Sequence, residues 1–261
     1  MKLAREGWGF VMTEPIEYAV RAGLGSLCLD DGKVNAMNLA WLERMQAALD
    51  LAEADDSRAL LLMGRPGCFS AGLDFKALSA LAPEDIKQTT DLFLAAMKRV
   101  FLFPKPVIAA STGHAVAGGM MLFLAADIRL AARDETSRYG LNEATTGVPF
   151  LGGTLGICQY GIPARHHTEL ILQGRMIDAA GCRERGIIEE VVEPEGLLEH
   201  AAERAEALGD LDLGVYAINK LLLRQDVYDA GVRKAKAMIG LAPKGNVFSA
   251  MGKPEEPGES P

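Results

Sequence analysis

Residues 69–74 read Phe-Ser-Ala-Gly-Leu-Asp, and residues 117–121, about forty-five positions later, read Ala-Gly-Gly-Met-Met. Small residues at both places let the backbone come close to a ligand. The second segment opens an apolar helix, and N–H groups at a helix N-terminus are suited to hold a negative charge. Two converging backbone N–H groups are what a developing oxyanion needs. A carboxylate between them, Glu143 in the Gly-Leu-Asn-Glu sequence of residues 140–143, would complete an acid/base site.

Strands and helices alternate on both sides of these segments. Apolar runs bounded by turn signals predict strands over residues 8–13, 18–29, 58–63, 107–110, 127–131 and 187–192, the second of them broken near residues 23–25. Helices are predicted over residues 38–54 and 83–103, with Asn38 as the N-cap of the first and Pro83 in the first turn of the second. Strands separated by helix-length segments predict parallel pairing in an α/β core.

Toward the C-terminus the pattern changes to helix alone. Candidate helices lie near residues 195–208 and 215–240, and no strand signal accompanies them. We therefore expect an α/β core over residues 1–195 and a helical region over residues 196–252. The last segment, residues 253–261, is polar and rich in proline, which predicts a disordered tail.

Composition and charge exclude several classes of protein. The formal net charge of −8 over 261 residues argues against nucleic acid as a partner, because such binding needs a basic face. The longest apolar run has about twelve residues, whereas a membrane-spanning helix needs about 20. The first residues lack the apolar stretch of a signal peptide. These features predict a soluble, cytoplasmic protein that does not enter a membrane.

Cysteine and histidine show no metal or disulfide pattern. His166 and His167 are adjacent and so diverge on a helix, and no other histidine has the spacing of a metal ligand, so we expect no metal. The cysteines are widely scattered and include no Cys-x-x-Cys pair, which predicts buried, reduced thiols. They are Cys28, Cys68, Cys158 and Cys182.

Common glycine-rich motifs are absent or incomplete. The serine-hydrolase elbow needs glycine two residues on each side of the serine, but Cys68 occupies one of these positions beside Ser70. No Gly-Lys-Ser/Thr sequence follows a glycine-rich loop, and the segment that begins at Gly23 lacks the third glycine of a dinucleotide fingerprint.

Four blocks, taken in order and with their spacing, resemble the enoyl-CoA hydratase/isomerase (crotonase) family over roughly residues 8–195. The blocks are Gly-Lys-Val-Asn-Ala-Met at 32–37, Phe-Ser-Ala-Gly-Leu-Asp-Phe at 69–75, Gly-His-Ala-Val-Ala-Gly-Gly at 113–119 and Gly-Leu-Asn-Glu at 140–143. The resemblance implies an α/β fold with a crotonase-like spiral of ββα units. It also implies a C-terminal helical region used in assembly, and a homotrimer or hexamer.

The resemblance also implies roles for individual residues. The backbone N–H groups of Leu73 and Gly118 would hold the thioester carbonyl oxygen of an acyl-CoA, and Glu143 would be the catalytic acid/base. Coenzyme A would arrive as part of the substrate, with no permanently bound cofactor. Further substrate contacts are expected at Lys33, Val34, Ala36, Ala71, Gly72, Asp74, Phe75, Lys76, Val116, Gly119 and Met121. Among these, Asp74 is more typical of a helix cap or a CoA contact than of a base.

One departure from the family pattern bears on the reaction. Hydratases of this family use two glutamates, and the position of the first falls on Met121, which cannot transfer a proton. Only Glu143 remains. Moving a double bond from the 3 to the 2 position needs a single base that takes a proton from C2 and returns it to C4. The sequence is closest in motif to the Δ3,Δ2-enoyl-CoA isomerases, so this activity is the leading hypothesis.

Other activities stay open on the same scaffold. A hydratase could recruit a different second acid, and a thioester hydrolase could use Glu143 to activate water. A third possibility, from another class, is a CoA-binding or assembly protein that keeps the fold without catalysis.

Overall fold

The computed structural model describes residues 13–238. Its main sheet has six strands in the order β1-β2-β4-β7-β9-β11. Their bounds are β1 (Ile16–Arg21), β2 (Leu24–Leu29), β4 (Ala59–Met63), β7 (Val107–Ser111), β9 (Ile128–Ala132) and β11 (Glu190–Val192). Strands β1 and β2 form an antiparallel hairpin, and every other neighbouring pair is parallel. The predicted parallel core is confirmed.

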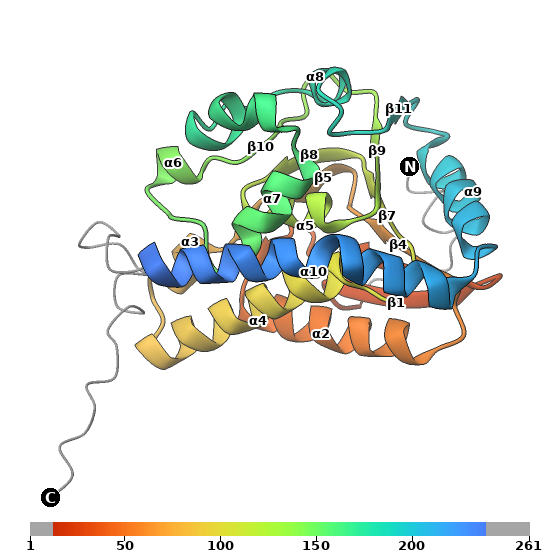
Figure 1. Cartoon of the computed structure of the whole chain (residues 1–261), viewed down its shortest axis with the longest axis horizontal. Coiled ribbons are helices and arrows are strands. Elements are labelled where there is room, and N and C mark those ends of the chain that lie inside the picture. Colours follow the sequence, from red (N-terminus) through yellow and green to blue (C-terminus); the bar gives the residue numbers. More distant parts are fainter. Residues whose placement is uncertain (1–12, 239–261) are drawn as a thin grey trace, which may run out of the picture.

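Helices cover both faces of this sheet (Figure 1). They are α2 (Leu39–Ala54), α3 (Phe75–Leu78), α4 (Pro83–Phe101), α5 (Gly118–Ala125), α6 (Glu143–Thr146), α7 (Thr154–Gly161), α8 (Ala179–Glu184), α9 (Leu197–Gly209) and α10 (Leu213–Met238), with short helical turns η1 (Ala164–His166) and η2 (Thr168–Leu172). The predicted N-cap is confirmed, since the Asn38 side chain accepts a hydrogen bond from the Trp41 amide at 2.9 Å. Pro83 begins α4, where a missing N–H costs nothing.

The buried strands have apolar side chains on both faces because each face meets a helical layer. In β4, Leu60 and Leu62 pack in the cluster that contains α2, α4 and α5, whereas Leu61 and Met63 pack in the cluster that contains α9. Successive side chains of a strand point to opposite faces, so this alternation follows directly from the pleat. A continuous apolar run is therefore the expected sequence of a doubly covered strand.

Two small sheets, which the sequence did not predict, connect the motif blocks. Strand β3 (Ala36–Met37) pairs in parallel with β6 (Gly72–Leu73). Strand β8 (Gly113–Val116) lies between β5 (Gly67–Ser70) and β10 (Tyr139–Gly140). These strands have only two to four residues, too few for a periodic pattern. They nevertheless bring the four blocks to one end of the core.

Some predicted boundaries were wrong. The strand predicted over residues 187–192 begins only at Glu190, because the amides of Ile187 and Ile188 donate to the Cys182 carbonyl at the end of α8. Helix α4 ends at Phe101, two residues earlier than predicted. Residues 8–12 of the first predicted strand, the last two residues of the helix predicted over 215–240, and the predicted disordered tail 253–261 lie outside the described residues.

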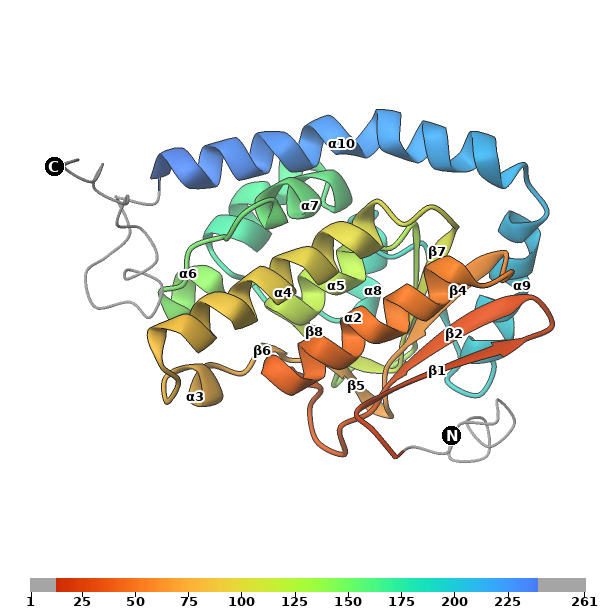
Figure 2. The same cartoon turned by 90° about the horizontal axis from the view of Figure 1, so that it is seen from below.

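Helix α10 runs along the outside of the molecule over α7 (Figure 2). A buried ion cluster fastens it to the core, since Asp127 accepts a hydrogen bond from Lys220 Nζ at 2.6 Å and forms an ion pair with Arg224 Nη1 at 2.8 Å. Burial lowers the pKa of Lys220 to about 8, although Asp127 opposes this effect. All four cysteines are buried and none of them forms a disulfide, as predicted. None of the helices within residues 13–238 is long and apolar enough to cross a membrane.

Candidate active site

A small cavity lies where the motif blocks meet. Its volume is about 20 Å³, which is room for about one water molecule. Five predicted site residues line it, namely Leu73, Phe75, Gly118, Met121 and Glu143. The structure thus brings Leu73, Gly118 and Glu143, the residues predicted to supply the amide donors and the carboxylate, to the wall of one space.

Close backbone packing places the two donor segments side by side. Gly118 is the first residue of α5, so its N–H has no partner within the helix. A Cβ atom on Gly72 would lie only 2.7 Å from the Gly118 nitrogen, and Gly72 has a φ of +84° that favours glycine. No larger residue fits this contact. The strand pair β3–β6 fixes the other side, with Leu73 opposite Met37.

Strand β10 of the three-stranded small sheet positions Glu143 at the cavity. Strand β10 pairs with β8, and the Ala117 amide donates to the Gly140 carbonyl at 2.9 Å. This bond fixes the chain three residues before Glu143 beside the start of α5. Helix α6 begins at Glu143 itself and ends after one turn at Gly147, which has left-handed backbone geometry.

The Glu143 carboxyl is buried and incompletely hydrogen-bonded. The residue is 5% exposed, and its Oε2 atom has no hydrogen-bond partner among the described residues. Burial raises the pKa of Glu143 from its usual 4.5 to about 7. Burial, and next the nearby Glu143 charge, also raise the pKa of the Cys158 thiol, so Cys158 stays neutral. A carboxyl group poised near neutrality is suited to proton transfer.

The remaining predicted contacts lie outside the cavity lining. Four of them are exposed. The loop before β3 carries Lys33 and Val34, the β5–β6 turn carries Ala71, and α3 carries Lys76. Ala36, Val116, Asp74 and Gly72 are half-buried or buried close to the strand pair and the start of α5. These residues form the surroundings of the cavity and not its wall.

Asp74 and Gly119 have clear structural roles. The Asp74 carboxylate caps α3 by accepting from the Ala77 amide at 2.9 Å, which confirms the prediction of a structural cap. Gly119 packs against β5, because a Cβ atom there would lie 2.0 Å from the Ser70 carbonyl oxygen. This contact makes α5 sit tightly on the small sheet.

Sequence reasoning missed half of the cavity wall. Residues of α4, the α6–α7 loop and α7 complete the lining, and they are Phe93, Val148, Pro149, Leu151 and Thr154, together with Ala117 at the start of α5. Phe93 lies on the buried face of an amphipathic helix, and apolar residues that line a cavity have the same pattern as those that fill a core. Nothing in the residue order distinguishes the two.

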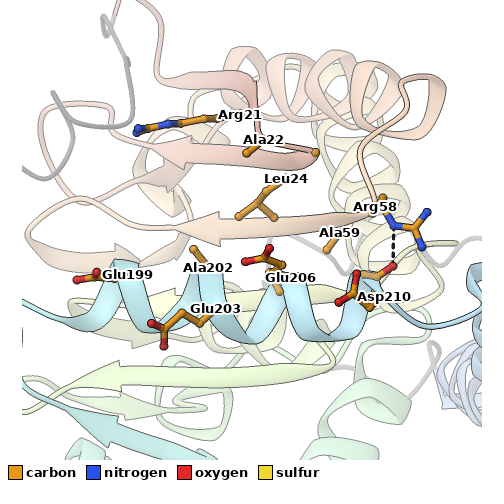
Figure 3. A pocket seen from close by; sticks show the side chains of 13 residues that line it. Arg21, Ala22, Leu24, Arg58, Ala59, Glu199, Ala202, Glu203, Glu206 and Asp210 are labelled. Atoms are coloured by element: carbon orange, nitrogen blue, oxygen red, sulfur yellow. Dashed lines mark hydrogen bonds between the residues drawn. The ribbon is translucent and has the colours of Figure 1, made fainter.

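A larger hollow of about 550 Å³ lies elsewhere, between the β1–β2 turn and α9 (Figure 3). Its labelled carboxylates, which include Glu199, Glu203 and Glu206, stand on the exposed side of α9 (Figure 3). Arg58 at its edge donates to the Gly209 carbonyl at 2.7 Å. The acids that line this hollow are all exposed, in contrast to the buried Glu143. No group of three or more His, Cys, Asp or Glu residues within residues 13–238 could hold a metal ion.

Comparison with known proteins gives consistent matches. The family described as enoyl-CoA hydratase/isomerase matches residues 20–243. A Rhizobium meliloti protein described as a probable enoyl-CoA hydratase is 34% identical over 182 residues, which are 69% of each chain. Another probable enoyl-CoA hydratase, EchA17 of Mycobacterium tuberculosis, is 32% identical over 191 residues, or 72% of each chain.

Solved structures agree with this result. A probable enoyl-CoA hydratase of Mycobacterium tuberculosis superposes with a TM-score of 0.80 at 27% identity, covering 91% of this chain and 99% of the other. A structure described as an enoyl-CoA isomerase of the same organism has a TM-score of 0.79 at 28% identity, covering 87% and 99%. Both descriptions refer to the same gene product, so the names do not separate the two activities. The likeness confirms the predicted fold class.

Proposed function

The chain belongs to the enoyl-CoA hydratase/isomerase family, and on that basis we propose that it shifts the double bond of a 3-enoyl-CoA to position 2. The main support is one buried carboxylate, Glu143, on the wall of a cavity that also includes Leu73 and Gly118. Met121 lines the same cavity, where hydratases of the family have their other glutamate.

The proposed reaction needs only groups of this chain and the substrate. The thioester oxygen accepts hydrogen bonds from the Leu73 and Gly118 amides. Ionised Glu143 removes a proton from C2, and the electron pair of that C–H bond moves to the carbonyl oxygen as an enolate. Fixed donors stabilise this charge where it develops. As the carbonyl re-forms, the C1–C2 electron pair of the enolate becomes the C2–C3 double bond. The π pair of the original C3–C4 double bond takes the proton that Glu143 returns to C4, which regenerates the carboxylate.

Recognition of the coenzyme is proposed for the exposed residues around the β3–β6 pair. Lys33 and Lys76 are exposed cations in this region, and cations attract the phosphates of coenzyme A. No resident cofactor is part of the proposal, because the proton shuttle uses Glu143 alone.

A homo-oligomer, trimer or hexamer, belongs to the same proposal. Helix α10 carries several large apolar side chains that are exposed in the single chain, with Leu222 at 76%. Large exposed apolar patches mark interaction surfaces. The exposed apolar residues of α10 are Val215, Ile218, Leu221, Leu222, Leu223 and Met238.

Hydration of a 2-enoyl-CoA is the second candidate, because the names of the relatives from Rhizobium meliloti and Mycobacterium tuberculosis favour it. That reaction must activate a water molecule and deliver a proton to C2. With Met121 in place of a carboxylate, a hydratase would need another polar group to hold the water.

Supplying a 3-enoyl-CoA and a 2-enoyl-CoA in separate assays distinguishes these functions. The conjugated thioester is followed by its ultraviolet absorbance. Isomerase activity predicts that conjugation appears from the 3-enoyl substrate and persists with the 2-enoyl substrate. Loss of conjugation from the 2-enoyl substrate, without formation of any from the 3-enoyl one, would establish hydration and refute the isomerase proposal.

The pH profile should show one ionisation near neutrality. Because the pKa of Glu143 is raised to about 7, the base is protonated and inactive at lower pH. We expect kcat/KM to rise roughly tenfold per pH unit below pH 7 and to level off above it. The profile is measured with the 3-enoyl substrate between about pH 5 and pH 8. A rate that is constant across this interval would show that Glu143 is not the base.

Replacing Met121 with Glu should raise hydration. The new carboxylate would share the cavity with Glu143 and could hold the attacking water. A positioned acid/base contributes about 10²- to 10⁴-fold, so we expect hydration of a 2-enoyl-CoA to increase by at least about tenfold. Met121→Gln is the matched control, since it is polar but cannot transfer a proton. An equal gain with Gln, or none with Glu, would mean that Met121 does not set the reaction.

A further inference from the structure

We propose that Ser70 is a positioning residue that fixes the orientation of the Leu73 amide donor. This inference rests on the proposed function, in which that amide holds the thioester oxygen. Ser70 lies at the end of β5, is completely buried, and does not line the cavity. It therefore acts through the backbone and not on the substrate.

The Ser70 hydroxyl uses both of its hydrogen-bonding directions. Its Oγ donates to the Asn35 carbonyl at 2.7 Å and accepts from the Gly72 amide at 3.1 Å. The first bond fixes the direction of the O–H group, so the lone pairs face Gly72. In this way the hydroxyl clamps the exposed turn at Ala71 between two buried points.

The Ser70 hydroxyl adds to the β3–β6 pairing in holding Gly72, which has no side chain to restrict its own backbone. Glycine has the widest φ/ψ range of any residue, and Gly72 has a φ of +84°. Its torsion angles set the direction of the next peptide group, which carries the Leu73 N–H. Gly118 lies directly against Gly72, so close that a Cβ atom on Gly72 would be 2.7 Å from the Gly118 nitrogen. A small rotation at Gly72 therefore changes how the two donors converge.

The Asn35 end of the clamp is rigid. Asn35 is completely buried, and its Nδ2 atom donates to the Leu29 carbonyl at 2.8 Å and to the Phe69 carbonyl at 2.9 Å. Its Oδ1 atom accepts from the Asp31 amide at 2.9 Å. Since three bonds hold this side chain, its own carbonyl is a fixed reference point for Ser70.

The chain contains a natural control for this arrangement. Ser111 is also completely buried, and its hydroxyl donates to the Gly113 carbonyl at 2.6 Å and accepts from the Gly113 amide at 3.4 Å. The spacing from serine to glycine is the same, but Ser111 ends β7 and has no place on the cavity wall. If replacing either serine with alanine lowered kcat equally, the loss would reflect only the stability of a buried turn.

The test compares Ser70→Ala, Ser70→Cys and Ser111→Ala with the 3-enoyl substrate. We expect Ser70→Ala to lower kcat roughly 10- to 100-fold, the effect of a misplaced group, while KM changes less than about threefold. Ser70→Cys keeps a weak donor and acceptor and should lie between Ser70→Ala and the natural protein. Ser111→Ala should keep its kcat.

A spectroscopic measurement separates positioning from stability. A cinnamoyl thioester of CoA with an electron-donating ring substituent absorbs at longer wavelength when its carbonyl oxygen is polarised by hydrogen bonds. We expect a red shift on binding to the natural protein and to Ser111→Ala, and a smaller shift with Ser70→Ala. An unchanged shift and kcat in Ser70→Ala, or equal losses in both alanine variants, would overturn the role of Ser70. Absence of any shift in the natural protein would instead refute the proposed oxyanion site.

Where Ser70→Ala does not fold, Ser70→Cys alone decides the question. Its kcat and red shift should then both fall below those of the natural protein, while Ser111→Ala keeps both. Natural values of kcat and red shift in a folded Ser70→Cys variant would overturn the proposal.

Discussion

Glu143→Gln should lower kcat by roughly 10²- to 10⁴-fold while acyl-CoA binding stays within a few fold of the natural value. Glutamine has the shape of glutamate but cannot take a proton from C2 or return it to C4. The binding surface around the β3–β6 pair does not involve this side chain. Single-turnover rates with a 3-enoyl-CoA measure the chemical step, and calorimetric titration with a CoA thioester measures binding.

Matched controls come from the larger hollow beside α9. Glu203→Gln and Glu206→Gln remove carboxylates there and should leave turnover unchanged. If Glu143→Gln keeps its turnover, Glu143 has no part in the mechanism. If the α9 variants lose turnover instead, the chemistry lies in the larger hollow and our placement of the site is wrong.

Glu143→Gln should also be more stable than the natural protein above pH 7. Burial raises the pKa of folded Glu143 to about 7 from the usual 4.5, so the folded state binds more protons than the unfolded state between these values. The stability from the neutral form is therefore complete below about pH 4.5 and is lost as pH rises to about 7. Glutamine avoids this loss, which is about 3 kcal/mol at most. Urea unfolding at pH 5 and pH 8 measures the difference.

Gly72→Ala should abolish most of the activity and also destabilise the fold. An alanine at a φ of +84° costs about 1–2 kcal/mol. Its Cβ atom would lie 2.7 Å from the Gly118 nitrogen, and relief of such overpacking costs about 1–3 kcal/mol more. The relief must push the Leu73 and Gly118 segments apart. Because a misplacement of about 1 Å costs about 10²-fold, we expect at least this loss of kcat.

Gly23→Ala is the control that imposes the strain of a positive φ without the steric contact that Gly72→Ala makes. Gly23 has a φ of +77° but open space where the Cβ atom would lie, and it is in the β1–β2 turn away from the cavity. We expect it to lose only about 1–2 kcal/mol of stability and to keep full activity. Urea unfolding and steady-state assays measure both variants. Equal stability losses, or full activity in Gly72→Ala, would contradict the role of the Gly72–Gly118 contact.

The main elements of the core could be predicted because their signals are local. Apolar runs bounded by glycine and proline identified β4 and β7, and Asn38 and Pro83 marked the starts of α2 and α4. Strand β11 was predicted too long. The Ile187 amide donates a hydrogen bond to the Cys182 carbonyl of α8, so this residue does not join the sheet. Hydrogen bonds between distant residues leave no periodic pattern in the sequence.

The site was predicted in part. The motif blocks identified Leu73, Gly118 and Glu143, and the structure places all three on one cavity. Phe93 and Leu151 also line the cavity, but no signal in the sequence identified them. Apolar residues that line a cavity have the same pattern as those that pack in the core. The exposed contacts predicted for CoA, such as Lys33, stay predictions.

The sequence by itself determined which chemical groups this protein has at its site. One carboxylate at Glu143, a thioether at Met121 and glycines at positions 72 and 118 are fixed by the residue order. Only the tertiary structure decided what these groups can do. Segments from α4, α5, α7 and the small sheets bury Glu143 and thereby raise its pKa, while Asn35 and Ser70 hold the donor turn. Desolvation and hydrogen-bond direction depend on neighbours that are distant in the chain, so they exist only once the chain has folded.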